Sequence, residues 1–179
     1  WTQNALVRML RLKQIVDHPL LLEENYEGTT SKLQALKDIV EDTDEKVVVF
    51  TQFVQMATIL RKEFNADIIE GKVSPQERLE VIKRFTEDDK QVLVSTDAGA
   101  YGLTITAASV VVHYDLTWNP AKQRQREDRL HRIGQKKSVT VIDLIADKTI
   151  DEYILEVLFR KMEAFDLIIE QADEAIVLR

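Results

Sequence analysis

The sequence predicts an α/β fold, a doubly wound parallel sheet flanked by helices, within a single domain of 179 residues. Two observations predict it. Five short segments are rich in Val, Ile and Leu at nearly every position, which is typical of strands covered on both faces of a parallel sheet. Segments with apolar residues at helical spacing lie between these strands, and such alternation gives right-handed crossovers in one sheet.

The first elements of the chain are two helices. Apolar residues recur at helical spacing over 4–22, and we expect this helix to stop at Pro19 because the residue before a proline resists the helical conformation. A second helix is expected over 31–40, with Thr30 or Ser31 as its N-cap.

Strands and helices alternate in the rest of the chain. The expected strands are 46–50, 66–70, 91–96, 109–115 and 138–146, and the expected helices are 53–64, 74–85, 120–132 and 150–171. One helix has a clear start signal, a capping box with Ser74 at the N-cap, Pro75 at the first helical position and Glu77 at the third. Because ligands of such folds gather at the carboxyl ends of the strands, we expect the functional residues in the segments that follow the strands.

The composition excludes several classes of protein. The chain has no Cys, which rules out a disulfide framework and Cys-ligated metal or iron–sulfur centres. No apolar run reaches the ~18–20 residues of a membrane span, and the first residues lack the pattern of a signal peptide. We therefore expect a soluble intracellular protein with no membrane partner. The three His residues lack metal-ligand spacing, so no metal site is expected.

The net charge of −7 hides a local excess of positive charge. Residues 122–137 contain seven basic and two acidic side chains, so this window carries +5 and the rest of the chain carries −12. A charge run is usually a solvated helix face, so a second observation is needed before the window counts as a functional site.

The helix expected over 120–132 supplies that second observation. At 100° per residue, four polar residues fall within one arc of this helix: Gln125, Asp128, Arg129 and Arg132. Two guanidinium groups on one face suit the stabilisation of charge on a transferring γ-phosphoryl group. The alternative is an exposed helix with ordinary ion pairs. Ile133 and Gly134, which follow the arc, favour a capped and packed helix end.

Glycines follow the strand expected over 91–96. Gly99 and Gly102 lie where small residues let backbone N–H groups approach an anion, usually a phosphate, and a plain turn is an equal alternative. The phosphate-binding loop G-x-x-x-x-G-K-[ST] is missing, because the only Gly-Lys pair, at 71–72, has Ala66 at the first glycine position. The sequence therefore predicts half of a nucleotide site, without a triphosphate cradle.

Six segments, taken in order, resemble the second RecA-like lobe of superfamily 2 helicases, specifically the SWI/SNF-type DNA translocases and chromatin remodellers. They are RLKQIVDHPLLL (11–22), SKLQALKDIV (31–40), KVVVFTQF (46–53), IIEGKVSPQERLEVIKRF (68–85), STDAGAYGLTITAASVVVHYDLTWNP (95–120) and QREDRLHRIGQ (125–135). The resemblance implies a single RecA-like lobe of the P-loop NTPase superfamily. It implies a helical segment over 1–29, the lobe over 30–148 and a long C-terminal helix over 149–179.

The resemblance also implies roles for single residues. Arg129 and Arg132 match arginine fingers that reach ATP held by another lobe. The positions matched to the nucleotide are Gly102, Gln125 and Asp128. The positions matched to the path of the DNA backbone are Thr51, Gln52, Gly71, Lys72, Thr96, Gly99 and Trp118. Asp97 stands where the family usually has Lys, which removes a positive charge beside that path.

The implied function is that of the C-terminal lobe of an ATP-dependent translocase on double-stranded DNA. ATP and Mg²⁺ would be held mainly by an N-terminal lobe of the same full-length chain, so residues 1–179 alone are expected to be monomeric and inactive. We expect a cytoplasmic or nucleoid location in a prokaryote or virus and a nuclear location in a eukaryote. Two alternatives stay open: an interaction module that docks a partner through the acidic helix at 151–179, and a lobe of an RNA helicase.

Overall fold

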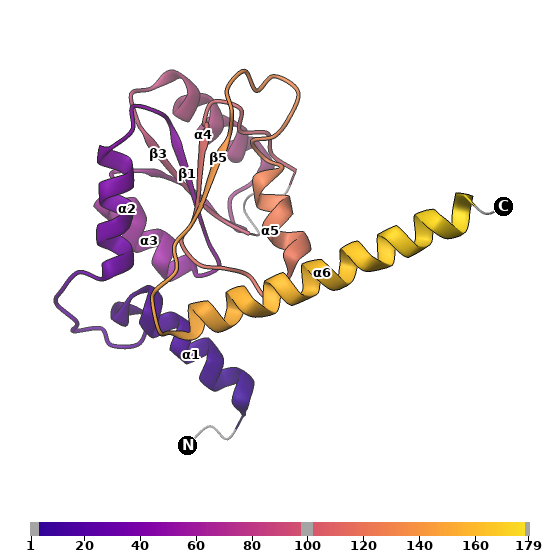
Figure 1. Cartoon of the computed structure of the whole chain (residues 1–179). Helices are drawn as coiled ribbons and strands as arrows, with labels where there is room; N and C mark the ends of the chain where they lie inside the picture. Colours follow the sequence, from indigo (N-terminus) through magenta and orange to yellow (C-terminus); the bar gives the residue numbers. More distant parts are fainter. Residues whose placement is uncertain (1–3, 98–101, 178–179) are drawn as a thin grey trace.

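A five-stranded parallel sheet forms the centre of the protein, whose computed structural model describes residues 4–97 and 102–177 (Figure 1). The strands are β1 (Val47–Thr51), β2 (Asp67–Ile69), β3 (Val92–Thr96), β4 (Val110–His113) and β5 (Thr140–Asp143). Their order is β2-β3-β1-β4-β5, and every pair is parallel. The strands that follow β1 in the chain therefore lie first on one side of it and then on the other, so the strand order reverses between β1 and β4. This confirms the predicted doubly wound sheet.

Helices cover both faces of the sheet (Figure 1). They are α1 (Ala5–Asp17), the 3₁₀ turn η1 (Pro19–Leu21), α2 (Ser31–Glu41), α3 (Val54–Glu63), α4 (Pro75–Glu87), α5 (Pro120–Glu127) and α6 (Ile150–Val177). One face of the sheet packs against η1, α2 and α3, and the other packs against α4 and the segments around Ile105 and Leu130. Successive residues of β1 alternate between these two cores, and all five are buried, as expected of a strand inside a parallel sheet.

Several predicted elements are shorter in the structure than in the sequence pattern. The strand expected over 138–146 is only Thr140–Asp143, at the edge of the sheet, and three of its four residues are exposed. The expected stop of the first helix at Pro19 is confirmed: α1 ends at Asp17, and the chain continues as the 3₁₀ turn because Pro19 cannot extend an α-helix.

The predicted helix over 120–132 was also too long, since α5 ends at Glu127. The chain then turns, so that the carbonyl of Arg129 accepts a hydrogen bond from the Ile105 N–H at 2.8 Å and Leu130 is fully buried in the core. Tertiary burial of Leu130 thus overrides the helical pattern. The predicted packing of Ile133 was wrong, because its side chain is fully exposed.

The predicted capping box of α4 is confirmed. The Glu77 N–H donates to the Ser74 hydroxyl oxygen at 3.3 Å, and the Ser74 N–H donates to the Glu77 carboxylate at 2.9 Å. We expect Ser74→Ala to lower the free energy of unfolding by about 1 kcal/mol, because it removes an acceptor for the helix N-terminus. Urea denaturation of the wild type and the variant measures this change; an unchanged midpoint would contradict it. Thr86→Ala, an exposed position in the same helix, is the control.

The long helix α6 starts against α1 and passes α5, and its C-terminal half extends beyond the rest of the molecule (Figure 1). In its first half, Ile154 and Leu158 are buried against Leu116. These two residues of the helix therefore pack on the domain itself. No helix among the described residues combines the length and the apolar character that crossing a membrane requires.

Candidate functional site

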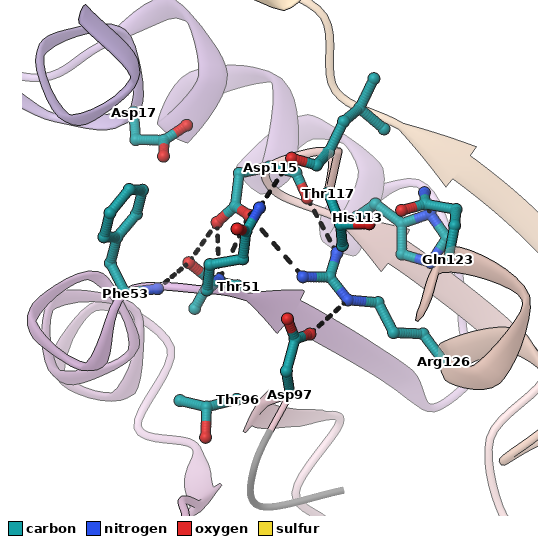
Figure 2. Close-up of polar contacts among 12 residues, drawn as sticks. Asp17, Thr51, Phe53, Thr96, Asp97, His113, Asp115, Thr117, Gln123 and Arg126 are labelled. Atoms are coloured by element: carbon teal, nitrogen blue, oxygen red, sulfur yellow. Dashed lines mark hydrogen bonds and ion pairs between the residues drawn. The ribbon is translucent and has the colours of Figure 1, made fainter. Parts of the chain in front are cut away.

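A buried polar network lies at the carboxyl ends of β1, β3 and β4, where the strand order reverses (Figure 2). Thr51 is the last residue of β1, Asp97 follows β3, and Asp115 lies two residues after β4. This is the part of the sheet in which the sequence predicted functional residues, because open α/β sheets bind ligands at such reversal points.

Asp115 is the central acceptor of the network. Its Oδ2 accepts hydrogen bonds from the Thr51 hydroxyl and from the backbone N–H of Gln52 at 2.9 Å, and its Oδ1 accepts from Gln52 Nε2 at 2.8 Å (Figure 2). Burial by itself would raise the pKa of Asp115, but the positive charges of Lys13 and Arg126, together with the hydrogen bonds from Thr51 and Gln52, outweigh burial and hold that pKa below its usual value. Asp115 is therefore an ionised, fully buried anchor for the end of β1.

Arg126 of α5 contacts this anchor and the end of β3. Its Nε lies 2.6 Å from Asp97 Oδ1, and one terminal nitrogen donates to the Asp115 carbonyl at 2.8 Å. The other terminal nitrogen lies 3.7 Å from Asp115 Oδ1. The side chain of Arg126 is only 2% exposed, so these contacts lie in a low-dielectric environment in which charge pairing is strong.

A second set of buried charges lies beside the first. Lys32 of α2 bridges two carboxylates at 2.8 Å each, Asp17 at the end of α1 and Asp151 at the start of α6. Burial and the nearby charge of Asp115 raise the pKa of Asp17 to about 7, although Lys32 and Lys13 act in the opposite direction. These charges connect three helices that are far apart in the sequence.

The raised pKa of Asp17 predicts a pH-dependent stability. The folded protein holds a proton that the unfolded chain releases near the ordinary Asp pKa of 3.8, so the contribution of Asp17 falls as the pH rises from about 4 to about 7. The contribution of Asp17 to the unfolding free energy changes by at most about 1.4 kcal/mol per pH unit. We expect the unfolding free energy of the wild type, minus that of Asp17→Asn, to fall between pH 5 and 7 and to be constant above pH 8. A difference that does not change with pH would disprove this assignment.

The predicted DNA-contact positions differ in their exposure. Thr51 and Thr96 are buried, and the Thr51 hydroxyl is bonded to Asp115, whereas Gln52 is half-buried at the edge of the network. Gly71 and Lys72 are exposed in the turn after β2. Trp118 is half-buried, and its ring forms a T-shaped pair with the ring of Tyr153 of α6, with the ring centroids 6.1 Å apart. Gly99 lies outside the described residues.

The predicted nucleotide positions do not share one helix face, because Gln125 lies in α5 whereas Asp128, Arg129 and Arg132 follow its end at Glu127. Arg129 is buried, at 5% exposed, whereas the remaining members of the predicted arc are exposed: Gln125, Asp128 and Arg132. The Arg132 guanidinium donates to the Thr104 hydroxyl at 3.0 Å, and its Nε donates to the Asp128 carbonyl at 3.2 Å. The exposed Arg132 is therefore held in place by two hydrogen bonds.

The segment that contains Gly102 lies next to the segment that contains Arg129 and Arg132. The hydrogen bond from Ile105 to Arg129 and the bond from Arg132 to Thr104 join residues 102–106 to residues 128–132. Gly102 is exposed, with a φ of +79° that favours glycine. The fold thus brings together two segments that the sequence assigned separately to phosphate recognition.

Sequence reasoning missed three residues of the buried network: Lys13, Asp115 and Arg126. Lys13 is 1% exposed, and its ammonium donates to the Leu116 carbonyl. A lysine in an amphipathic helix and an arginine in a basic run both look like solvated charges in a sequence, and no local pattern marks them as buried. Only Asp115, two residues after a buried strand, carried a positional signal.

Comparisons of the sequence with known proteins find helicases. The model of the helicase conserved C-terminal domain matches residues 31–134. The putative ATP-dependent helicase/translocase YwqA of Bacillus subtilis is 38% identical over 89% of this chain, and the ISWI chromatin-remodeling complex ATPase ISW1 of Saccharomyces cerevisiae is 31% identical over 91%. The chain spans only 19% and 16% of the length of these two relatives.

Solved structures show the same likeness. The Sulfolobus solfataricus SWI2/SNF2 ATPase core in complex with double-stranded DNA is 36% identical, with a TM-score of 0.74 over 96% of this chain and 38% of that one. The C-terminal domain of the Sulfolobus solfataricus SWI2/SNF2 ATPase is 33% identical, with a TM-score of 0.70 over 91% of this chain and 71% of that one.

Proposed function

Because the chain belongs to the helicase conserved C-terminal domain family, within its SWI/SNF-type ATP-dependent helicases, we propose that it is the C-terminal lobe of a translocase on double-stranded DNA. In this proposal the lobe supplies arginine fingers to ATP and contacts to the DNA backbone. An N-terminal lobe supplies the phosphate-binding loop, which this sequence lacks.

The observation that carries the proposal is the arrangement around Arg132. Its guanidinium is exposed, is fixed by Thr104 and Asp128, and stands beside the segment of Gly102. A fixed cationic fork in this position suits a γ-phosphoryl group presented by another lobe, because arginine stabilises the charge that spreads over the phosphoryl oxygens during transfer. Arg129 is proposed as the second finger, and Gln125 and Asp128 as neighbours of the nucleotide.

The carboxyl edge of the sheet is the proposed DNA face. Gln52, Lys72 and Trp118 present polar, cationic and aromatic groups on segments that follow β1, β2 and β4. Thr51, Gly71, Thr96 and Gly99 complete the proposed face, with the buried Thr51 fixing the position of Gln52 through Asp115. Backbone contacts suit a motor that moves along any sequence, so its affinity for DNA should fall with salt. The DNA-bound Sulfolobus core favours DNA over RNA as the partner.

ATP and Mg²⁺ are the proposed cofactors, held mainly by the other lobe. Among residues 4–97 and 102–164, no three His, Asp or Glu side chains lie close enough together to hold a metal ion. The donor set of this chain therefore fits the phosphoryl oxygens of ATP through Arg132, and does not fit Mg²⁺ by itself. We propose that residues 1–179 alone do not hydrolyse ATP, because they lack the phosphate-binding loop, and that they act as a monomer and work inside the cell.

The test joins this chain to a compatible lobe that carries a phosphate-binding loop. DNA-stimulated ATP hydrolysis that is lost in Arg132→Ala supports the proposal. ATP hydrolysis by residues 1–179 alone, if Arg132→Ala abolishes it, would contradict the division of the site between two lobes.

A further inference from the structure

The guanidinium of Arg126 links the ends of three strands to α5. It forms an ion pair with Asp97 after β3 and donates to the Asp115 carbonyl after β4 (Figure 2). It also lies over the Phe50 ring of β1, 5.8 Å from the ring centroid. The Arg126 side chain is almost completely buried. Its position is therefore set by the sheet, and it sets the position of α5 in turn.

One end of this network reaches the proposed DNA face. Asp115 holds the Thr51 hydroxyl together with the backbone N–H and side-chain amide of Gln52. Asp97 directly follows Thr96. A shift of the DNA-facing segments after β1 or β3 would therefore change the positions of Asp115 and Asp97, whose carboxylates contact Arg126.

The other end reaches the proposed arginine fingers. The backbone N–H of Arg129 donates to the carbonyl of Arg126 at 3.2 Å, and Arg132 follows in the same turn. This hydrogen bond is part of a tight turn, so displacement of Arg126 would also displace the segment that carries Arg129 and Arg132.

The charges of Asp97 and Arg126 are matched. The Asp97 carboxylate faces the buried guanidinium at 2.6 Å, whereas a lysine at this place would face it with like charge. The acidic residue after β3 thus helps to hold α5 in place.

We propose that Arg126 is a positioning residue that couples DNA contact at the strand ends to the placement of Arg129 and Arg132. The inference rests on the proposed function, since it needs both a DNA face and arginine fingers. It goes further by assigning the connection between them to one buried side chain and its partner Asp97.

The experiment compares Arg126→Gln, Asp97→Asn, the double variant and the control Lys122→Gln in the two-lobe protein. We expect Arg126→Gln to lower the ATPase rate with DNA at least tenfold more than the rate without DNA, while the KM for ATP stays within about threefold. Asp97→Asn should have a smaller effect in the same direction and add little to Arg126→Gln, because the two residues act as one unit. Lys122, an exposed residue of the same helix, should behave as the wild type.

Three outcomes would overturn the proposal. One is an unchanged ratio of rates with and without DNA in a folded Arg126→Gln protein. Another is a parallel loss of both rates with a lowered melting temperature, which indicates a purely structural role. If Arg126→Gln does not fold, an unchanged ratio in Asp97→Asn overturns the proposal, since the Asp97 side chain is 25% exposed and its replacement should be tolerated. If Arg132→Ala keeps full activity, the proposed function itself fails; if Arg132→Ala is inactive and Arg126→Gln is normal, only the coupling fails.

Discussion

Arg132→Ala in the two-lobe protein is expected to lower DNA-stimulated ATP hydrolysis by about 10³–10⁵-fold, the range known for arginine fingers. The physical reason is that the guanidinium meets negative charge that grows on the phosphoryl oxygens only as the transition state forms. Substrate binding depends less on this interaction, so the KM for ATP should change much less than kcat. Steady-state ATPase assays with saturating DNA measure both quantities.

The exposure of Arg132 makes this experiment easy to interpret. Its side chain contributes two surface hydrogen bonds, to Thr104 and to the Asp128 carbonyl, and no core packing, so the variant should fold normally. Arg132→Lys keeps the charge but loses the planar fork and should recover only a small part of the rate. Lys136→Ala, which removes an exposed charge from the same basic window, is the matched control. A loss below tenfold for Arg132→Ala would remove the arginine from the proposed catalytic role.

Lys32→Met is expected to have the largest effect on stability. It leaves the buried carboxylates of Asp17 and Asp151 without their shared cation, and removing one partner of a buried ion pair costs about 3–5 kcal/mol. The cost should shrink at pH 5, because the remaining carboxylates can then take up protons. Urea denaturation at pH 5 and pH 7.5 measures both expectations.

The same helix offers the control for this variant. Lys37 of α2 pairs with Glu63 near the surface, where its side chain is 31% exposed, and such pairs contribute about 0–1 kcal/mol. Lys37→Met should therefore be nearly neutral. Adding Asp17→Asn to Lys32→Met should restore part of the loss, since one uncompensated charge is removed. Equal effects of Lys32→Met and Lys37→Met would show that the buried bridge contributes nothing special to folding.

Local patterns in the sequence were sufficient for most of the fold. The all-apolar run 46–50 predicted a central strand, and β1 is buried on both faces because helices pack against each of them. The capping box at Ser74 predicted the start of α4 to the residue, since its bonds join groups only three positions apart. Signals of this kind depend on near neighbours, and the chain fulfils them wherever tertiary contacts do not compete.

The candidate site was predicted in location but not in geometry. The segments after the strands do converge at the carboxyl edge, and residues 102–106 do lie against residues 128–132. The helical wheel over 120–132 failed because burial of Leu130 and the bond between Arg129 and Ile105 end α5 early. A wheel assumes that the helix continues, and only contacts with residues more than twenty positions away decide whether it does.

The basic window 122–137 shows most clearly what the sequence determined and what the tertiary structure decided. The sequence by itself determined that seven cations are concentrated there in a chain of net charge −7. Only the tertiary structure decided which of them face solvent: Arg126 and Arg129 are buried, Lys137 pairs with Glu45, and Arg132 is presented at the surface. The physical reason is that composition fixes how much charge a segment carries, whereas the free energy of each charge depends on the burial and partners that the folded chain supplies.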